Sequence, residues 1–96
     1  MTANIIRVLA LGIVQNDQGA LLVDAGYDNI KKQSFYRLLG GGIEFGETGA
    51  EALEREFIEE LGLEVTPSPL LSTTENIFTF EGQLGHQISL GAVLDN

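Results

Sequence analysis

The 96-residue sequence contains 14 Asp and Glu residues, five Lys and Arg residues and no Cys, which gives a net charge of −9. This length indicates a single domain, and a hydrophobic fraction of 44% excludes a wholly disordered chain. The acidic balance argues against binding to a nucleic-acid polymer, whose phosphates require a basic surface, but a metal ion can still bridge carboxylates to a small phosphorylated ligand. The absence of Cys excludes disulfides, thiolate zinc sites and Cys nucleophiles.

An apolar segment near the N-terminus, residues 5–14, is interrupted by Arg7 and is too short to span a bilayer. It has no basic region before it and no small-residue cleavage site after it, so a buried strand is favoured over a signal peptide. We therefore expect a cytoplasmic protein that does not associate with membranes.

The first part of the chain predicts strands. Residues 5–14 are rich in Ile, Val and Leu, which favours a long strand. A turn signal at residues 16–19 and a short return strand at residues 20–24 predict a hairpin with that first strand. We expect a polar loop over residues 25–33 and then a strand over residues 34–39, which the three glycines that follow end.

Residues 48–61 predict the one clear helix. Thr48 can cap its N-terminus, and Glu51 three residues later completes a capping box. Gly62 stands where a left-handed residue ends many helices. Four apolar residues recur at helical spacing and predict the face turned to the core: Ala50, Leu53, Phe57 and Leu61.

Strand-like segments follow the helix. A strand is expected to begin at residues 63–65, and Pro67 and Pro69 indicate a bend. Residues 71–80 and 86–94 have strand composition, and residues 81–85 read as the hairpin loop between them. Together these elements predict an α+β fold with a mixed sheet and a helix on one face.

Seven of the 14 acidic residues fall between positions 41 and 63. Glu56, Glu59 and Glu60 share one side of the predicted helix, beside its apolar stripe, where three like charges repel. A hard divalent cation such as Mg²⁺ or Mn²⁺ would make this arrangement favourable. The alternative is an ordinary solvated acidic face. A calcium-binding EF-hand is excluded because its ligand spacing is absent.

The glycines at positions 40–42 alone indicate either a tight turn or a weak phosphate-binding loop, and no Walker lysine follows them. In sequence order, however, residues 41–63 read Gly41, five residues, Glu47, seven residues, Arg-Glu-Phe, one residue, Glu-Glu, one residue and Gly-Leu. This pattern resembles the Nudix box. Phe57 is a less usual choice at its position than Ile, Leu or Val. The resemblance implies the Nudix fold, an α/β/α sandwich with a mixed sheet and the box helix.

The Nudix resemblance implies hydrolysis of a diphosphate linkage in a nucleoside diphosphate joined to another group, with Mg²⁺ or Mn²⁺ as cofactor. Glu59 and Glu60 match the principal metal-binding carboxylates of the family, and Glu56 matches a position that binds metal and acts as general base in some members. The backbone carbonyl of Gly41 is a further expected ligand. Similar sequences often carry Glu where this chain has Gln87, which cannot act as a base, so we assign the base to Glu56.

Other roles carry over in the same way. Glu47 and Arg55 match an ion pair that holds the loop against the helix, with Arg55 expected to lie away from the metal side. Arg37 is the candidate for contact with a substrate phosphate, and a surface arginine at a strand edge is the equal alternative. Tyr27, Phe35 and Tyr36 are candidates for stacking on a base or for plain packing. The identity of the small nucleotide-type substrate stays open.

Typical Nudix proteins continue beyond the length of this chain with a further strand and a second helix. We therefore expect a single Nudix domain over residues 1–96 that is incomplete at its C-terminus and lacks that helix. An uncovered sheet face would favour a homodimer or other self-association. The shortened chain also keeps a second hypothesis open, in which the protein is a non-catalytic nucleotide-binding or regulatory module.

Overall fold

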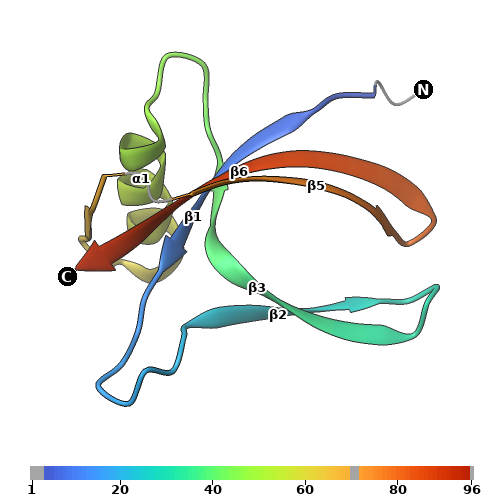
Figure 1. Ribbon diagram of the computed structural model, residues 1–96, viewed down its shortest axis with the longest axis horizontal. Coiled ribbons are helices and arrows are strands. Elements are labelled where there is room, and N and C mark those ends of the chain that lie inside the picture. Colours follow the sequence, from blue (N-terminus) through green and yellow to red (C-terminus); the bar gives the residue numbers. More distant parts are fainter. Residues whose placement is uncertain (1–3, 70–71, 96) are drawn as a thin grey trace.

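The computed structural model describes residues 4–69 and 72–95, and within them the chain forms one helix and a six-stranded sheet. In chain order the elements are β1 (Arg7–Ile13), β2 (Val23–Asp28), β3 (Gln33–Gly42), α1 (Gly49–Leu61), β4 (Thr66–Pro67), β5 (Ser72–Phe80) and β6 (Gln83–Asp95). The strand order is β2-β3-β1-β6-β4, and β5 pairs with β6 (Figure 1). β1 is antiparallel to β3 and parallel to β6, so the predicted mixed sheet is confirmed.

The predicted hairpin between the first two strands forms only around its turn. Backbone hydrogen bonds join Asn16 to Ala20 and Leu22 to Val14, on either side of an isolated bridge between Gln15 and Leu21, but β2 pairs along its whole length with β3. Part of the segment expected to be a polar loop, from Ala25 to Asp28, therefore belongs to a strand. Its composition is weak for a strand, but antiparallel pairing with β3 supplies the backbone partners that decide the conformation.

The glycines of β3 do not end the strand, as the sequence had predicted, but continue it to Gly42. A Cβ atom on Gly40 would lie 1.9 Å from the carbonyl oxygen of Ala10, and the φ of Gly40 is 153°. Only glycine combines this backbone angle with so close an approach of β3 to β1. The glycine segment is thus a close pairing of β3 with β1 and not a break in the strand.

Helix α1 begins and ends where the sequence predicts. The Thr48 side chain accepts a hydrogen bond from the Glu51 amide, and the Glu51 carboxylate accepts one from the Thr48 amide. Gly62 adopts the left-handed conformation at the C-terminus, with φ 67°. Both caps are confirmed because each depends on residues within a few positions of the helix end.

The buried face of α1 differs in part from the prediction. Leu53 and Phe57 are buried as expected, but Ala52 replaces Ala50 in the core, and Leu61 is 44% exposed. The helix packs against the sheet with a core of six buried residues: Ala10, Ala52, Leu53, Phe57, Ala92 and Leu94. The buried residues of α1 lie in the middle of the helix, where it contacts the sheet, so Leu61 in its last turn lies outside this core.

The strands after the helix also shift. No strand begins at residues 63–65; β4 is the short pair Thr66–Pro67, which bonds to the end of β6. The β5–β6 hairpin is confirmed, but its turn is only Glu81 and Gly82, both with positive φ, so residues 83–85 belong to β6. Such a two-residue turn matches the twist of the paired strands. Leu71 lies outside the described residues.

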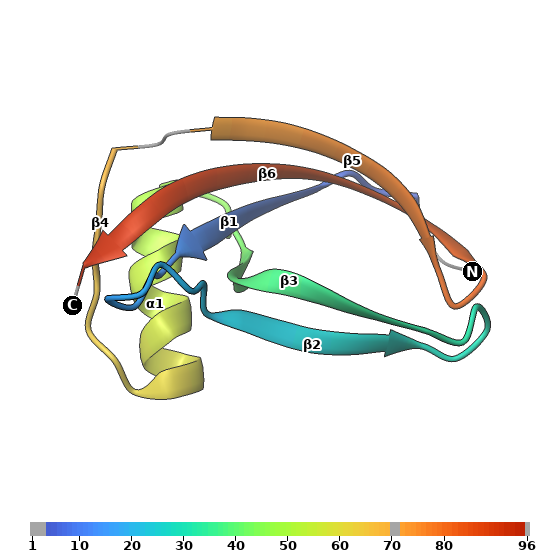
Figure 2. The same ribbon diagram turned by 60° about the horizontal axis from the view of Figure 1, so that its bottom comes forward.

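Two hairpins extend from the region of α1 and face one another, β2–β3 below and β5–β6 above (Figure 1). Figure 2 shows that their tips come together at the end remote from the helix. No helix in the described ranges is long and apolar enough to span a membrane. The cytoplasmic location stays a prediction.

Candidate functional site

The Glu56 carboxylate lies directly against Gly41. A Cβ atom at position 41 would come within 2.5–2.9 Å of the three carboxyl atoms of Glu56. The side chain of Glu56 is only 16% exposed. Helix α1 and the end of β3 thus bring together two of the residues predicted to hold a metal, and glycine is the residue that leaves room for the carboxylate.

Arg55 connects the loop, the strand and the helix. Its guanidinium donates to the Glu47 carboxylate through Nε and Nη2 at 2.8 and 2.9 Å, and to the Gly42 carbonyl oxygen at 3.0 Å. The predicted pair between Glu47 and Arg55 is confirmed. Nη1 also donates to Glu56 at 2.9 Å and to Glu59 at 3.4 Å, so the expectation that Arg55 lies away from the glutamates is wrong.

The electrostatics of the site follow from these contacts. The hydrogen bonds from Arg55 and from the Glu44 amide lower the pKa of Glu47 to about 2. The hydrogen bonds that Arg55 donates to Glu47 and, next, to Glu56 raise the pKa of Arg55. A hydrogen bond with the Glu56 carboxyl, together with desolvation and the charge of Glu56, raises the pKa of Glu60. Glu56 and Glu60 therefore lie close enough that keeping both ionised is costly.

The glutamates fit a hard divalent cation by their chemistry. Glu56 and Glu60 approach one another, and the cleft over Gly41 is occupied by carboxylate oxygens, the donors that Mg²⁺ and Mn²⁺ prefer. Glu59, 57% exposed, is turned to Arg55. Across the described residues no three acidic or His side chains lie close enough together to hold a metal ion as placed.

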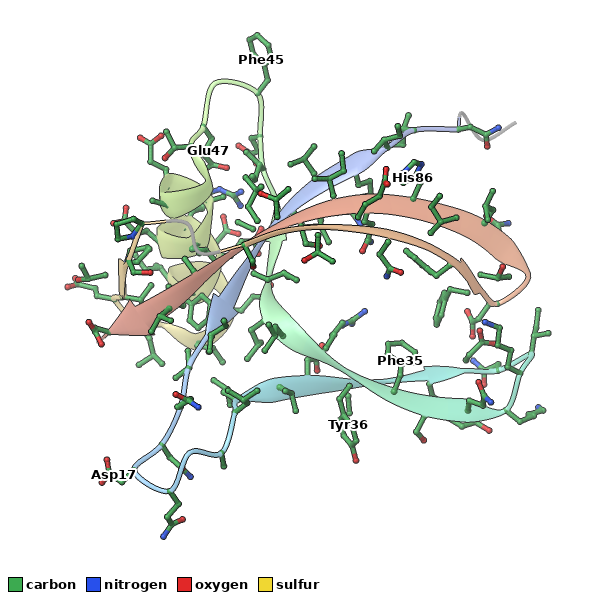
Figure 3. All side chains as sticks on the ribbon, in the orientation of Figure 1. Asp17, Phe35, Tyr36, Phe45, Glu47 and His86 are labelled. Atoms are coloured by element: carbon green, nitrogen blue, oxygen red, sulfur yellow. The ribbon has the colours of Figure 1, made fainter. Side chains whose placement is uncertain are left out.

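A cavity of about 720 Å³ opens beside these glutamates, between the two hairpins. Gly41 and Glu60 lie at one end of its lining, and Phe35, Phe80 and Lys31 line it toward the hairpin tips. Figure 3 shows the Phe35 ring pointing between the hairpins, while Tyr36, 75% exposed, points away. Tyr27 does not line the cavity, so of the three stacking candidates only the Phe35 ring is directed at it.

Arg37 also lines the cavity. It donates to Asp24 through Nη2 at 3.2 Å and lies over the Phe35 ring, with 5.8 Å between its guanidinium carbon and the ring centre. The Arg37 side chain is 61% exposed, so it can reach a ligand, but its charge is shared with Asp24.

A buried carboxylate that was not among the predicted site residues joins the hairpin tips. Asp28 is 3% exposed and accepts hydrogen bonds from the Ile30 and Lys31 amides in its own turn and from the Glu81 amide of the other hairpin, each at 2.9 Å. These amides, that of Glu81 first, lower the pKa of Asp28. Asn29 donates to the Glu81 carboxylate as a second link. The partners are 52 and 53 residues apart, so no local pattern marks them.

Gln87 and His86 fall on opposite faces of β6. Gln87 lines the cavity, whereas Figure 3 shows His86 on the outer side of the strand, where its Nε2 lies 3.0 Å from Glu75 Oε2. The residue that stands in place of the glutamate of similar sequences therefore faces the cavity as a neutral amide.

Comparison with sequence models of known families matches the NUDIX domain to residues 5–93, almost the whole chain. The chain belongs to the Nudix family. The resemblance of residues 41–63 to the Nudix box is thus confirmed.

Two curated relatives carry the name nucleoside triphosphatase NudI. The protein from Enterobacter sp. (strain 638) is 44% identical over 62 residues, and that from Escherichia coli O139:H28 is 39% identical over 66 residues. The matches cover 62% and 64% of this chain and 44% and 47% of those proteins. The chain thus spans about half the length of the curated relatives it matches.

Solved structures confirm the Nudix fold. The MutT protein from Methanosarcina mazei Go1 superposes with a TM-score of 0.72 at 18% identity, over 97% of this chain and 65% of that one. The Escherichia coli ORF135 protein has a TM-score of 0.64 at 23% identity, over 93% of this chain and 61% of that one. At these identities the likeness concerns the fold alone.

Proposed function

We propose that this Nudix protein hydrolyses a diphosphate linkage in a small nucleotide-type substrate with the help of Mg²⁺ or Mn²⁺. The observation that carries the proposal is the Glu56 carboxylate seated against Gly41 and beside Glu60, next to a cavity of about 720 Å³ that Gly41 and Glu60 line. The names of the NudI relatives support a nucleoside triphosphate as the substrate class to test first.

Glu56, Glu59, Glu60 and the Gly41 carbonyl are the proposed metal ligands. When bound, the cation would neutralise the diphosphate and stabilise charge on the leaving oxygen. Glu56 would accept a proton from the attacking water while the oxygen of that water bonds to phosphorus and the bridging P–O bond of the substrate breaks. Arg55 and Glu47 position this carboxylate, and Arg37 is the proposed substrate contact at the outer part of the cavity.

The test is hydrolysis of a panel of nucleoside triphosphates and diphosphate derivatives with Mg²⁺ or Mn²⁺, with the nucleotide and phosphate products resolved. We expect Glu59→Gln and Glu60→Gln each to lower kcat by about 100-fold or more, because each removes a charged ligand of the cation. Glu54→Gln, which removes an exposed charge from the same helix, is the matched control. Product release that persists in both site variants would refute the assignment.

A binding module without catalysis is the second candidate, because Gln87 faces the cavity where similar sequences have a carboxylate. It predicts that nucleotides raise Tm by mass action but are recovered unchanged. The proposed hydrolase predicts in addition that Mg²⁺ raises the Tm of the wild type more than that of Glu60→Gln. Thermal unfolding with and without metal, beside product analysis, separates the two.

A further inference from the structure

Three of the five cationic residues of this acidic chain line the cavity, and they differ in what they bind. Arg37 is paired with Asp24, and Lys31 Nζ donates to the Thr79 carbonyl oxygen at 2.6 Å near the hairpin tips. Arg7 makes no ion pair and no side-chain hydrogen bond with any part of the chain that the structure describes. Its five N–H donors are therefore available to a ligand.

Arg7 lies close to the end of β3, where Gly41 lines the same cavity. One of its terminal nitrogens, Nη2, is 3.2 Å from the position that a Cβ atom on Gly42 would take. The carbonyl oxygen of the same Gly42 accepts a hydrogen bond from Arg55. Arg55 is committed to carboxylates, so Arg7 is the neighbouring cation whose charge is not already balanced by an ion pair among the residues described.

The strand register places two neutral amides next to Arg7. Arg7 of β1 pairs with Gln87 of β6, and Gln87 pairs with Asn76 of β5, so the three form a row across the sheet. All three line the cavity. Because side chains alternate along a strand, Arg7 and Leu9 lie on the face of β1 opposite to the buried Ala10. The row supplies N–H donors and contains no carboxylate.

From this row we propose that Arg7, flanked by Gln87 and Asn76, binds the phosphate chain of the ligand, an assignment that rests on the proposed function of the neighbouring glutamates. Arginine presents paired N–H groups that match phosphate oxygens, and its charge offsets the repulsion between the ligand and the carboxylates of α1. The chemistry recognised is a di- or triphosphate group, and the amides extend the donor row along it. Arg7 is thus a binding residue that discriminates by phosphate number.

The experiment compares binding of nucleoside monophosphates with that of triphosphate analogues whose bridging oxygens are replaced by methylene, so that no hydrolysis occurs. Titration calorimetry in the presence of Mg²⁺ measures the affinity for both ligands with each of the four nucleosides adenosine, guanosine, cytidine and uridine. For the base that the wild type binds, we expect Arg7→Gln to weaken the triphosphate analogue about tenfold and the monophosphate about threefold at most. A general folding defect would weaken both ligands alike.

Lys32→Gln is the matched control, because it makes the same change in net charge at an exposed turn position that does not line the cavity. We expect it to leave both affinities within twofold of the wild type, as the charge is remote and screened. If Arg7→Gln does not fold, Arg7→Lys decides: it keeps the charge but loses the paired donors, and we expect a several-fold loss confined to the triphosphate analogue.

Any of three results would overturn the assignment of Arg7. Arg7→Gln could weaken the two ligands equally, it could leave the affinity for the triphosphate analogue unchanged, or the wild type could bind no triphosphate analogue. Hydrolysis is measured separately. Binding that depends on Arg7 without glutamate-dependent hydrolysis would leave Arg7 as the phosphate contact and refute the proposed function. Glutamate-dependent hydrolysis with affinities insensitive to Arg7 would support the proposed function and refute the assignment of Arg7.

Discussion

Arg55 is the residue through which the loop before α1, the end of β3 and the glutamates of α1 are joined. Its shortest contact, at 2.8 Å, is with Glu47, and its bonds to Glu56 and Glu59 place a positive charge among groups that would otherwise repel. The same nitrogen, Nη1, donates to both Glu56 and Glu59, so Arg55 joins these two carboxylates. In the proposed function, a divalent cation would compete with this guanidinium for the same carboxylate oxygens.

The pair between Glu47 and Arg55 makes stability depend on pH. The pKa of Glu47 is lowered to about 2 from an ordinary value of 4.5, so its contribution is complete above pH 4.5 and is lost as the pH falls toward 2. We expect Glu47→Gln to lower Tm at pH 7 and to flatten the fall in the free energy of unfolding between pH 4.5 and 2. Denaturant titrations across this range measure both effects, with Glu54→Gln as control; parallel pH profiles for Glu47→Gln and wild type would contradict the prediction.

Strand β3 serves two partners in succession. Residues from Gln33 to Leu38 pair with β2, and those from Leu39 to Gly42 pair with β1. The glycines at the change of partner have different tasks: Gly40 permits the crossing over β1, and Gly41 leaves room for the Glu56 carboxylate. A single strand thus holds both the cavity wall and the floor of the glutamate site.

The two glycines predict opposite outcomes for the same substitution. In Gly41→Ala the added methyl group meets the flexible end of Glu56, so we expect the fold to persist with Tm within about 5 °C of wild type while activity falls about tenfold or more. In Gly40→Ala the methyl group meets backbone at 1.9 Å, so we expect the chain to unfold at a much lower temperature or not to fold. Thermal unfolding and the hydrolysis assay on both variants test this; full activity of Gly41→Ala would contradict the role given to its glycine.

The elements that the sequence predicted correctly are those marked by neighbouring residues. The ends of α1 follow from Thr48, Glu51 and Gly62, and the pair between Glu47 and Arg55 follows from a family pattern in which the two residues stand eight positions apart. The pairing of β2 with β3 did not follow, because the partner of a strand is fixed by register over the whole sheet and not by the next turn. The buried residues of α1 were predicted only in part, since the angle at which a helix meets a sheet is a tertiary property.

The site was predictable to the same extent. The glutamates and Gly41 belong to one continuous pattern, and the structure brings Glu56, Glu60 and Gly41 together. Arg7 and Asp28 lie outside that pattern. Their significance depends on cross-strand register and on contacts between distant hairpins, which composition and spacing along the chain do not encode.

At the scale of the whole molecule, Asp28 links the two hairpins at their tips, beside the cavity that they line. In Asp28→Asn one oxygen can still accept the two amides of its own turn, but the new amide group faces the Glu81 N–H, and this bond between the hairpins is lost. We expect Tm to fall by about 5 °C and nucleotide affinity to fall with it, because, among the hydrogen bonds described between the hairpin tips, only those from Asn29 and Lys31 then remain. Asp17→Asn, at the exposed turn labelled in Figure 3, is the control. Unchanged Tm and affinity in Asp28→Asn would show that the link is dispensable.

Self-association stays a prediction from the sequence. Large apolar side chains on the strands are exposed, among them Tyr36 at 75%, Ile77 at 61% and Leu84 at 76%. We expect a homodimer at micromolar concentration, because burying such groups together removes apolar surface from water. Sedimentation equilibrium measures the mass directly, and a monomer at all concentrations up to about 100 μM would contradict the prediction.

The continuity of β3 also sets a length. Gly41 lies six positions after Phe35, which corresponds to at most about 20 Å along an extended strand. Since the aromatic ring and the glycine against which Glu56 lies belong to the same strand, β3 sets the distance between the two ends of the cavity. A molecule much shorter than this span can touch the aromatic ring or the carboxylates but not both at once.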